Sequence, residues 1–321
     1  MNQKVKIVVL DGYAMNPGDL SWNGLAELGD LTVHDRTPAG QILARSAGAT
    51  CLLTNKTPMT RETLALLPDL RYIGVLATGY NIIDTVAARE LGIVVANVPA
   101  YSTMSVAQLV FALLLELCHH VGAHNDAVKR GEWTNNPDFA FWNYPLIELD
   151  QKTFGIIGFG KIGRAVARIA PTFGLKVLVS TDHPDPAFAG ALEYVSREEL
   201  FARSDIISLH SPLNDKSKGM INAAAIARMK DGVFLINTAR GPLIVDQDLA
   251  DALNSGKVGA AAMDVATIEP IQADNPLLKA RNVIQTPHFA WAPKEARIRL
   301  MQITVTNLAA FVAGKPINVV N

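Results

Sequence analysis

Short hydrophobic runs alternate with amphipathic, helix-like segments along most of the chain. In the first hundred residues, the runs KIVVL, LTVH, TCLLT, RYIGV and IVVANV have the composition of buried strands. The segments TRETLALLP and IDTVAAREL between them have the spacing of helices. Apolar strands that alternate with helices are typical of parallel sheets covered on both faces. The pattern therefore predicts an α/β unit.

The alternation resumes at residue 152 with the runs TFGII, LKVLVS, LEYV, DIISLH, GVFLINT, GAAAMDV and NVIQTPH. These runs predict a second parallel sheet. Before it, we expect one long apolar helix over Ser105–Val121, followed by the Trp- and Asn-rich segment GEWTNNPDFAFWNYP. After it, Lys294–Ala313 has the pattern of a last helix.

A chain that leaves one α/β unit, completes another and returns through a final helix makes its first domain discontinuous. We therefore predict a fold of class α/β with two Rossmann-like domains. Residues 1–101 and 292–321 form a flavodoxin-like substrate domain. Residues 102–291 form a dinucleotide-binding domain inserted in it.

Composition narrows the possible functions. The chain has 321 residues, 49% of them hydrophobic and 18% charged, with a formal net charge of −1, which describes a globular protein. Scattered Lys and Arg indicate no nucleic-acid or membrane partner. The N-terminus resembles no secretory signal, and the distant Cys51 and Cys118 form no disulfide or metal pattern. We expect a cytoplasmic protein without a metal site.

Three glycines, Gly158, Gly160 and Gly163, have the spacing G-x-G-x-x-G between a strand pattern and a helix pattern. In that context the first glycine permits a tight turn, the second lets the backbone approach a pyrophosphate, and the third allows close packing of helix on strand. The N-terminus of the following helix would attract the phosphates. The turn predicts a dinucleotide site; a purely structural turn is the alternative.

The end of the next strand bears on the type of cofactor. Asp182 lies 19 residues after Gly163, where a carboxylate accepts the ribose hydroxyls of NAD and repels the 2′-phosphate of NADP. No arginine occurs in Ser180–Pro186 to receive that phosphate. An ordinary solvated loop acid is the alternative interpretation of Asp182. NAD is the favoured cofactor, and NADP is not excluded.

Three ionisable residues, Arg240, Glu269 and His288, follow successive strand patterns of the second sheet. Ligands of α/β sheets bind at the carboxyl ends of the strands, so all three are candidates for chemistry. Taken singly, each also has a structural explanation. Arg240 could form a surface ion pair, Glu269 could be a loop carboxylate, and His288 could cap a helix.

Several ordered motifs resemble the D-isomer-specific 2-hydroxyacid dehydrogenase family, and its glycerate dehydrogenase and hydroxypyruvate reductase members most of all. They are LATGYNIID, NVPAYSTMSVAQ, GFGKIGRAVA, LHSPLNDKSKGMIN, MKDGVFLINTARGPLIVDQDLADAL, MDVATIEP and NVIQTPHFAWAP. The resemblance covers nearly the whole chain. It implies a split two-domain enzyme that transfers a hydride between NAD(P) and a 2-oxo or 2-hydroxy acid.

The resemblance also implies roles for the ionisable residues. Arg240, in NTARG, matches the arginine that holds the substrate carboxylate and polarises the carbonyl; a guanidinium stays charged and can make two directed hydrogen bonds. His288, in TPHFAW, matches the acid/base that protonates the carbonyl oxygen. Glu269, in IEP, matches the carboxylate that orients the imidazole and favours its charged form.

For the substrate, the resemblance implies that backbone N–H groups around Thr78 and Gly79 hold the carboxylate, with Ala77, Asn55 and Lys56 at the border of the pocket. For the cofactor, it implies backbone contacts from Lys161 and Ile162 to the pyrophosphate. It places His210, Ser211 and Pro212 at the ribose and adenine side of the cofactor. It places Thr238 and Asp264 near the nicotinamide, where Asp264 would hold the carboxamide. The family's usual aspartate aligns with Thr181 instead of Asp182, which leaves strict NAD preference open.

The aromatic segment and the function each have alternatives. The segment EWTNNPDFAFWNYP either packs on its own domain or forms the arm of a homodimer, and the resemblance favours the arm. An NAD(H)-sensing corepressor-like protein is one competing function, because relatives of this fold act in that way. A 3-phosphoglycerate dehydrogenase is another, for which only Lys56 offers a nearby phosphate partner.

Overall fold

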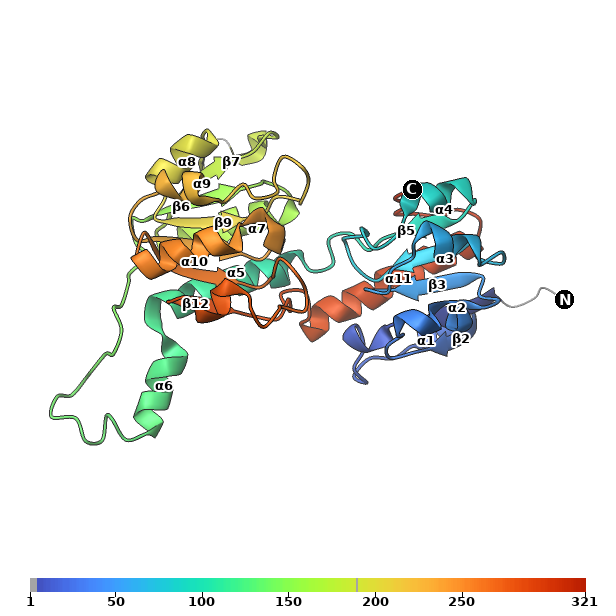
Figure 1. Ribbon diagram of the computed structural model, residues 1–321, viewed down its shortest axis with the longest axis horizontal. Helices are drawn as coiled ribbons and strands as arrows, with labels where there is room; N and C mark the ends of the chain where they lie inside the picture. Colours follow the sequence, from blue (N-terminus) through green and yellow to red (C-terminus); the bar gives the residue numbers. More distant parts are fainter. Residues whose placement is uncertain (1–4, 189) are drawn as a thin grey trace. The chain divides into compact units, whose positions relative to one another are not determined.

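The computed structural model describes residues 5–188 and 190–321 (Figure 1). The chain forms two compact units. Met1–Ser102 and Ala292–Asn321 make up the first unit, and Thr103–Trp291 make up the second. The first unit is thus discontinuous, and the second is inserted between its two segments.

The first unit contains a five-stranded sheet in the order β2-β1-β3-β4-β5, and every ladder in it is parallel. Each strand coincides with one of the predicted hydrophobic runs, shortened or shifted at its ends. The strands are β1 (Val5–Val9), β2 (Gly29–Val33), β3 (Cys51–Thr54), β4 (Tyr72–Val75) and β5 (Val94–Ala96).

Helices cover both faces of this sheet because its strands are apolar on both sides. Buried residues such as Leu52 and Ile73 belong to a core cluster with residues of α2 (Ile42–Ser46), α3 (Arg61–Ala65) and α4 (Thr85–Glu90). The last helix, α11 (Lys294–Val312), packs on β4 and on α1 (Asn23–Ala26). There Tyr72 and Phe311 lie with ring centroids 4.7 Å apart. The returning C-terminal segment therefore completes the first unit.

The second unit contains a seven-stranded parallel sheet in the order β12-β11-β10-β9-β6-β7-β8. The strands are β6 (Thr153–Ile157), β7 (Lys176–Ser180), β8 (Glu193–Tyr194), β9 (Ile206–Leu209), β10 (Val233–Asn237), β11 (Val258–Met263) and β12 (Val283–Gln285). The strand order reverses between β6 and β9. In sheets of this type a ligand binds at the carboxyl ends of the strands at such a reversal.

Alternate residues of each strand point to opposite faces, so the sheet carries two separate cores. Phe154 and Ile156 pack with α5 (Thr103–His119) and α7 (Lys161–Ile169). Ile157 packs with residues of α8 (Arg197–Arg203), α9 (Ala223–Ala227) and α10 (Asp246–Ser255) on the other face. The prediction of parallel α/β sheets is confirmed.

The helix predicted over Ser105–Val121 is wrong in its extent. It is α5, which begins at Thr103 and ends at His119, and a second helix, α6 (Val121–Lys129), follows directly. His120 between them has φ +48°, a left-handed conformation that breaks the helical hydrogen-bond ladder. Apolar spacing alone does not reveal this break. In Figure 1, α6 and the loop after it extend away from the seven-stranded sheet.

No single helix in the described ranges is long and apolar enough to cross a membrane. The two helices α5 and α6, which are bent by 54° relative to each other, reach the length and composition of a membrane span only when they are counted together. Most of α5 is buried against the second sheet, which explains its hydrophobic composition.

Phe154 offers a test of this core. Its side chain is fully buried and stacks on Phe111 of α5, with ring centroids 6.1 Å apart. We expect Phe154→Ala to lower the free energy of unfolding of the second unit by about 3–5 kcal/mol, because it removes buried contacts and leaves a cavity. Urea unfolding measures the change. The variant Leu278→Ala, at a half-exposed residue, serves as the control and should lower the free energy of unfolding by less than about 1 kcal/mol. Equal losses of stability in the two variants would contradict the assignment of the core.

Candidate active site

The glycine turn after β6 is built by close backbone approaches. Gly158 has φ +92°, and a Cβ there would lie 2.7 Å from the backbone of His210 and Ser211. A Cβ on Gly163 would lie 2.3 Å from the carbonyl oxygen of Gly158. Only glycine fits at these two positions, so the sequence spacing reflects real steric limits.

The N-terminus of α7 is open to a ligand. Gly160 precedes the helix, is exposed, and has no atom within 4 Å of the place where a Cβ would stand. No side chain caps the first turn of this helix. Its N–H groups and partial positive charge are therefore available to an anion, and the missing Cβ lets that anion come close. These residues fit the pyrophosphate of a dinucleotide.

The loop after β7 carries an exposed carboxylate. Asp182 makes no hydrogen bond or ion pair with the described residues, while the hydroxyl of Thr181 accepts the N–H of His183 at 3.1 Å. The nearest arginine in the glycine motif, Arg164, lies with Nε 3.1 Å from Oδ2 of Asp185. Asp182 is thus free to accept hydroxyl groups, and Arg164 is already ion-paired.

His210 and the residues after it follow β9 and face the glycine turn. The His210 Nε2 atom lies 2.8 Å from the Ser208 hydroxyl, and burial lowers the pKa of His210 to about 4. The Ser211 hydroxyl donates to the carbonyl of Ile157 at 3.3 Å, and the carbonyl of Pro212 accepts the Ser217 hydroxyl at 2.7 Å. His210 is therefore a neutral, structural neighbour of Gly158 at ordinary pH.

The loop after β10 carries Thr238 and Arg240. The buried Thr238 hydroxyl has no partner among the described residues, and buried polar groups normally have one. The Thr238 hydroxyl is therefore available for a hydrogen bond to a ligand. Arg240 donates from Nη1 to the carbonyl of Ala239 at 2.7 Å, and its own carbonyl accepts the Asn237 side chain at 2.9 Å. Gly241 then packs directly on another loop, since a Cβ there would lie 2.0 Å from the carbonyl carbon of Ala266.

That second loop leads to Glu269, which pairs with His288. The distance between Glu269 Oε2 and His288 Nδ1 is 2.7 Å, and the Ala266 N–H donates to Oε1 at 3.2 Å. The two side chains are 32% and 27% exposed, so the pair is accessible but partly shielded. Two residues 19 positions apart in sequence are thus brought into direct contact.

Asp264 fixes the loop that carries His288. Its buried carboxylate accepts the Thr286 hydroxyl at 2.7 Å and the N–H groups of Phe289 and Ala290 at 3.1 and 2.9 Å. Burial raises the pKa of Asp264, while these hydrogen bonds and the nearby His288 oppose the rise. His288 itself has φ +53°, a left-handed conformation that costs a non-glycine residue about 1 kcal/mol or more. The Asp264 hydrogen bonds hold this strained loop in place.

This anchoring role of Asp264 was missed by the sequence analysis, which placed the residue only at the nicotinamide. Its Oδ2 atom accepts one donor and retains capacity for another, so the nicotinamide contact stays a prediction. The only sequence signal for the anchoring role was the position of Asp264 directly after a buried strand.

In the first unit, the candidate substrate residues lie at the ends of β3 and β4. The Asn55 side chain is buried and donates to the carbonyl of Leu76 at 2.7 Å, whereas Lys56 is exposed. Asp11, which the sequence analysis did not single out, accepts the N–H groups of Asn55 and Lys56 at 2.7 and 2.6 Å. Asn55 is therefore used within its own unit, and the Lys56 side chain is free to contact a ligand.

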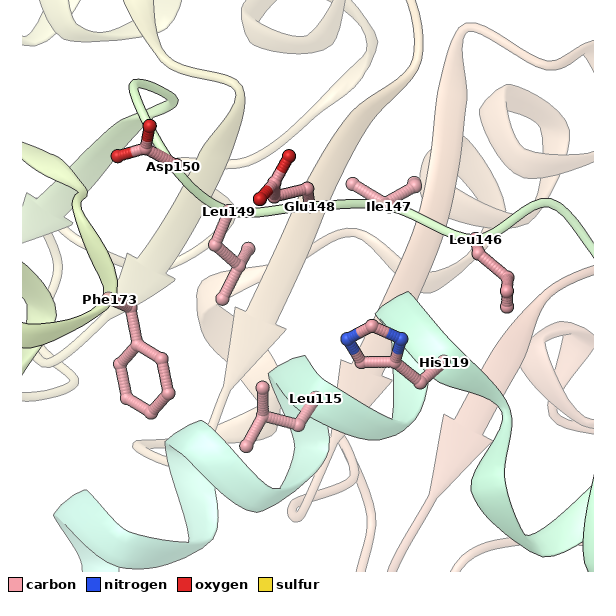
Figure 2. A pocket seen from close by; sticks show the side chains of 8 residues that line it. All are labelled: Leu115, His119, Leu146, Ile147, Glu148, Leu149, Asp150 and Phe173. Carbon is pink, nitrogen blue, oxygen red and sulfur yellow. The ribbon is translucent and has the colours of Figure 1, made fainter.

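A separate pocket of about 570 Å³ lies on the second unit, away from the glycine turn. Figure 2 shows Leu115 and His119 of α5 opposite the extended segment 146–150. Phe173 closes one end. None of the predicted catalytic or cofactor residues lines it.

The fold and the glycine turn define a class: a two-domain dehydrogenase with an NAD(P)-binding domain of the Rossmann type. Residues 111–290 match the family described as "D-isomer specific 2-hydroxyacid dehydrogenase, NAD binding domain". The chain belongs to the D-isomer specific 2-hydroxyacid dehydrogenase family, as the motif resemblance predicted.

Comparisons with individual proteins agree. The chain is 55% identical over 321 residues to a hydroxypyruvate reductase of Blautia hydrogenotrophica, covering 99% of this chain and 100% of the relative. It is 40% identical to a glycerate dehydrogenase of Methylorubrum extorquens, covering 87% and 88%. A solved acyclic imino acid reductase in complex with NADPH and D-Arg superimposes with a TM-score of 0.85 at 32% identity, covering 99% and 100%.

The low pKa of His210 predicts a pH dependence of stability. In the unfolded chain a histidine titrates near pH 6.5, so between about pH 6.5 and 4 the unfolded state binds more protons than the folded state. The contribution of neutral His210 to the free energy of unfolding is therefore complete above pH 6.5. It is lost as the pH falls through this window, and the full loss is about 3 kcal/mol. His210→Gln should remove this part of the pH dependence in urea unfolding at pH 7 and 4.5. The exposed His183→Gln should keep it, and identical slopes for both variants would contradict the prediction.

Proposed function

We propose that the protein is an NAD(H)-dependent hydroxypyruvate and glyoxylate reductase that also oxidises D-glycerate, with His288 as the acid/base. The observation that carries this proposal is the 2.7 Å contact between His288 Nδ1 and Glu269 Oε2. The names of the hydroxypyruvate reductase and glycerate dehydrogenase relatives favour these substrates among the small 2-hydroxy acids.

The contact determines what the imidazole can do. A carboxylate oxygen only accepts, so Nδ1 of His288 carries the proton of that hydrogen bond. Nε2 is then the atom that exchanges a proton with the substrate oxygen. Glu269 keeps the ring oriented and stabilises its charged form, which is the form that protonates a carbonyl oxygen during reduction.

The remaining roles follow the family resemblance. Arg240 would hold the substrate carboxylate and polarise its carbonyl through directed N–H groups. Thr78 and Gly79 would bind the carboxylate through their backbone N–H groups. When bound, the nicotinamide cofactor supplies or accepts the hydride. Supporting this, Arg240 stands in a loop whose backbone packs against the segment leading to Glu269.

The cofactor site fits NAD better than NADP. Asp182 is exposed and unpaired within the described ranges, so it can accept the ribose hydroxyls of NAD and would repel a 2′-phosphate. The Nε atom of Arg164 already lies 3.1 Å from Oδ2 of Asp185. Around the pyrophosphate, the first turn of α7 with Lys161, Ile162 and Gly163 would supply the N–H groups. Gly158, whose own N–H donates to the carbonyl of Ser180, would form the tight turn, and Gly160 would leave room for the phosphates. Thr238 would contribute its unpaired hydroxyl.

The direct test follows NADH oxidation with hydroxypyruvate and with glyoxylate. We expect His288→Ala to lower kcat by about 10²–10⁴-fold, and Glu269→Gln to lower it less, because Glu269 acts only through the imidazole. The Kd for NADH, measured by fluorescence, should not change. His34→Ala, a histidine of the first unit, is the control and should keep wild-type kcat.

Two other outcomes would be informative. Tight NADH binding by the wild-type protein without turnover of any small 2-oxo acid would favour the NAD(H)-sensing alternative. Equal kcat/KM with NADPH would contradict the cofactor preference.

We also propose that the protein is a cytoplasmic homodimer joined through the arm, defined as α6 and the loop to Tyr144. The arm is held in shape by its own bonds, for the Asn143 N–H donates to His124 at 3.1 Å and its side chain donates to Glu132 at 3.0 Å. Yet Phe139 is 93% exposed and Trp142 is 66% exposed. A preformed apolar surface of this size favours burial by a second copy.

The pocket of Figure 2 supports this proposal, because it lies at the base of the arm beside Leu146 and combines apolar walls with Glu148 and Asp150. We expect sedimentation equilibrium at micromolar concentration to give a dimer for the wild type. Phe139→Asp should shift the protein toward a monomer, because it would bury an unpaired charge. Leu66→Asp, on the exposed surface of the first unit, is the control and should remain dimeric. A monomeric wild type would remove the proposal.

A further inference from the structure

In the turn that follows β4, residues 76–79, the first three carbonyl groups are anchored. The carbonyl of Leu76 accepts the Asn55 side chain. The carbonyl of Ala77 accepts the N–H of Val98 at 3.0 Å. The carbonyl of Thr78 accepts Nδ2 of Asn97 at 2.7 Å. Two successive carbonyls, those of Ala77 and Thr78, are therefore bound by the same neighbouring segment.

This arrangement departs from an extended strand, in which successive carbonyls point in opposite directions. In a planar trans peptide the carbonyl of one residue and the N–H of the next point to opposite sides. Since the Ala77 and Thr78 carbonyls both face residues 97 and 98, the N–H groups of Thr78 and Gly79 both face away from them. Neither N–H has an acceptor within the described ranges. Two successive free N–H groups that point the same way form a concave anion site.

The side chain of Asn97 donates the hydrogen bond that holds the second of these carbonyls, that of Thr78. Asn97 is 9% exposed and is itself held by the C-terminal part of the chain. Its carbonyl accepts Nδ2 of Asn307 on α11 at 2.8 Å, and its N–H donates to the carbonyl of Asn318 at 3.1 Å. The Asn318 side chain in turn donates to Oδ1 of Asn307 at 2.8 Å. These contacts form a chain of amides, of which Asn97 and Asn307 are buried, and the chain ends on the carbonyl of Thr78.

We propose that Asn97 is a positioning residue for substrate binding: it turns the Thr78 carbonyl so that the N–H groups of Thr78 and Gly79 together bind the substrate carboxylate. The inference rests on the proposed reductase function. Asn97 does not touch the substrate; it sets the orientation of one peptide group. An amide is needed because its NH₂ group donates to a carbonyl, which a carboxylate or an alkyl side chain of the same size cannot do.

The test uses the full-length protein and the variant Asn97→Leu, which is neutral and similar in size, with Asn97→Asp as a second variant in case the first does not fold. We expect the KM for hydroxypyruvate and glyoxylate to rise about tenfold or more, because the Thr78 carbonyl loses its donor and the peptide can turn. The value of kcat should change far less, since carboxylate binding is lost equally from ground state and transition state. The Kd for oxamate in the presence of NADH should rise by the same factor, and the Kd for NADH should stay constant.

Asn16→Leu is the matched control. Asn16 is also a buried asparagine of the first unit, 6% exposed, and its side chain holds the loop through the carbonyl and N–H of Leu20. It should lower thermal stability as Asn97→Leu does but leave KM and the oxamate Kd unchanged. Equal effects of the two variants, or an unchanged KM in both Asn97 variants, would overturn the inference.

The experiment also separates this inference from the proposed function. A wild type that binds oxamate but reduces neither oxo acid would refute the function, while the oxamate Kd would still test Asn97. A wild type that binds no oxamate would refute the carboxylate site and with it the role of Asn97.

Discussion

The buried carboxylate of Asp264 is the constraint on which the candidate active site depends. It follows β11 directly, and its own N–H is bound by the carbonyl of Asn237 at the end of β10. Its oxygens accept donors from the segment 286–290 that follows β12. One residue therefore ties together the ends of three neighbouring strands, through its backbone N–H to β10 and its side chain to the segment after β12. Because the loop carrying His288 is strained, it would relax without these bonds, and the imidazole would lose its place beside Glu269.

The first unit uses the same device with different residues. Asp11 follows β1 and holds the backbone after β3, while Asn55 and Asn97 hold the backbone after β4. In both units the strands are short and apolar, and they carry no ligand-binding groups themselves. Buried polar side chains at the strand ends orient the loops, and the loops present N–H groups or charged side chains. Such side chains are costly to bury unless every bond is made, which makes the loop geometry well defined.

The arm has the opposite character. Its loop is ordered by hydrogen bonds among polar side chains of α6 and the returning segment, but its aromatic side chains remain exposed. The left-handed residue His120 directs the arm away from the sheet. An element whose backbone is held by its own hydrogen bonds and whose aromatic side chains are exposed is suited to association, which is the reason to look for a second copy of the chain.

The sequence by itself determined the two parallel sheets, the position of every strand, the glycine turn and the family, because hydrophobic periodicity and steric limits at Gly158 and Gly163 are local properties. It did not reveal the break at His120, since the left-handed conformation of a single residue leaves no mark on the hydrophobic pattern. Nor did it reveal the anchoring by Asp264, Asp11 and Asn97. These side chains act on backbone groups far away in sequence, and only the packing of strand ends in the tertiary structure decides which carbonyl or N–H lies within reach.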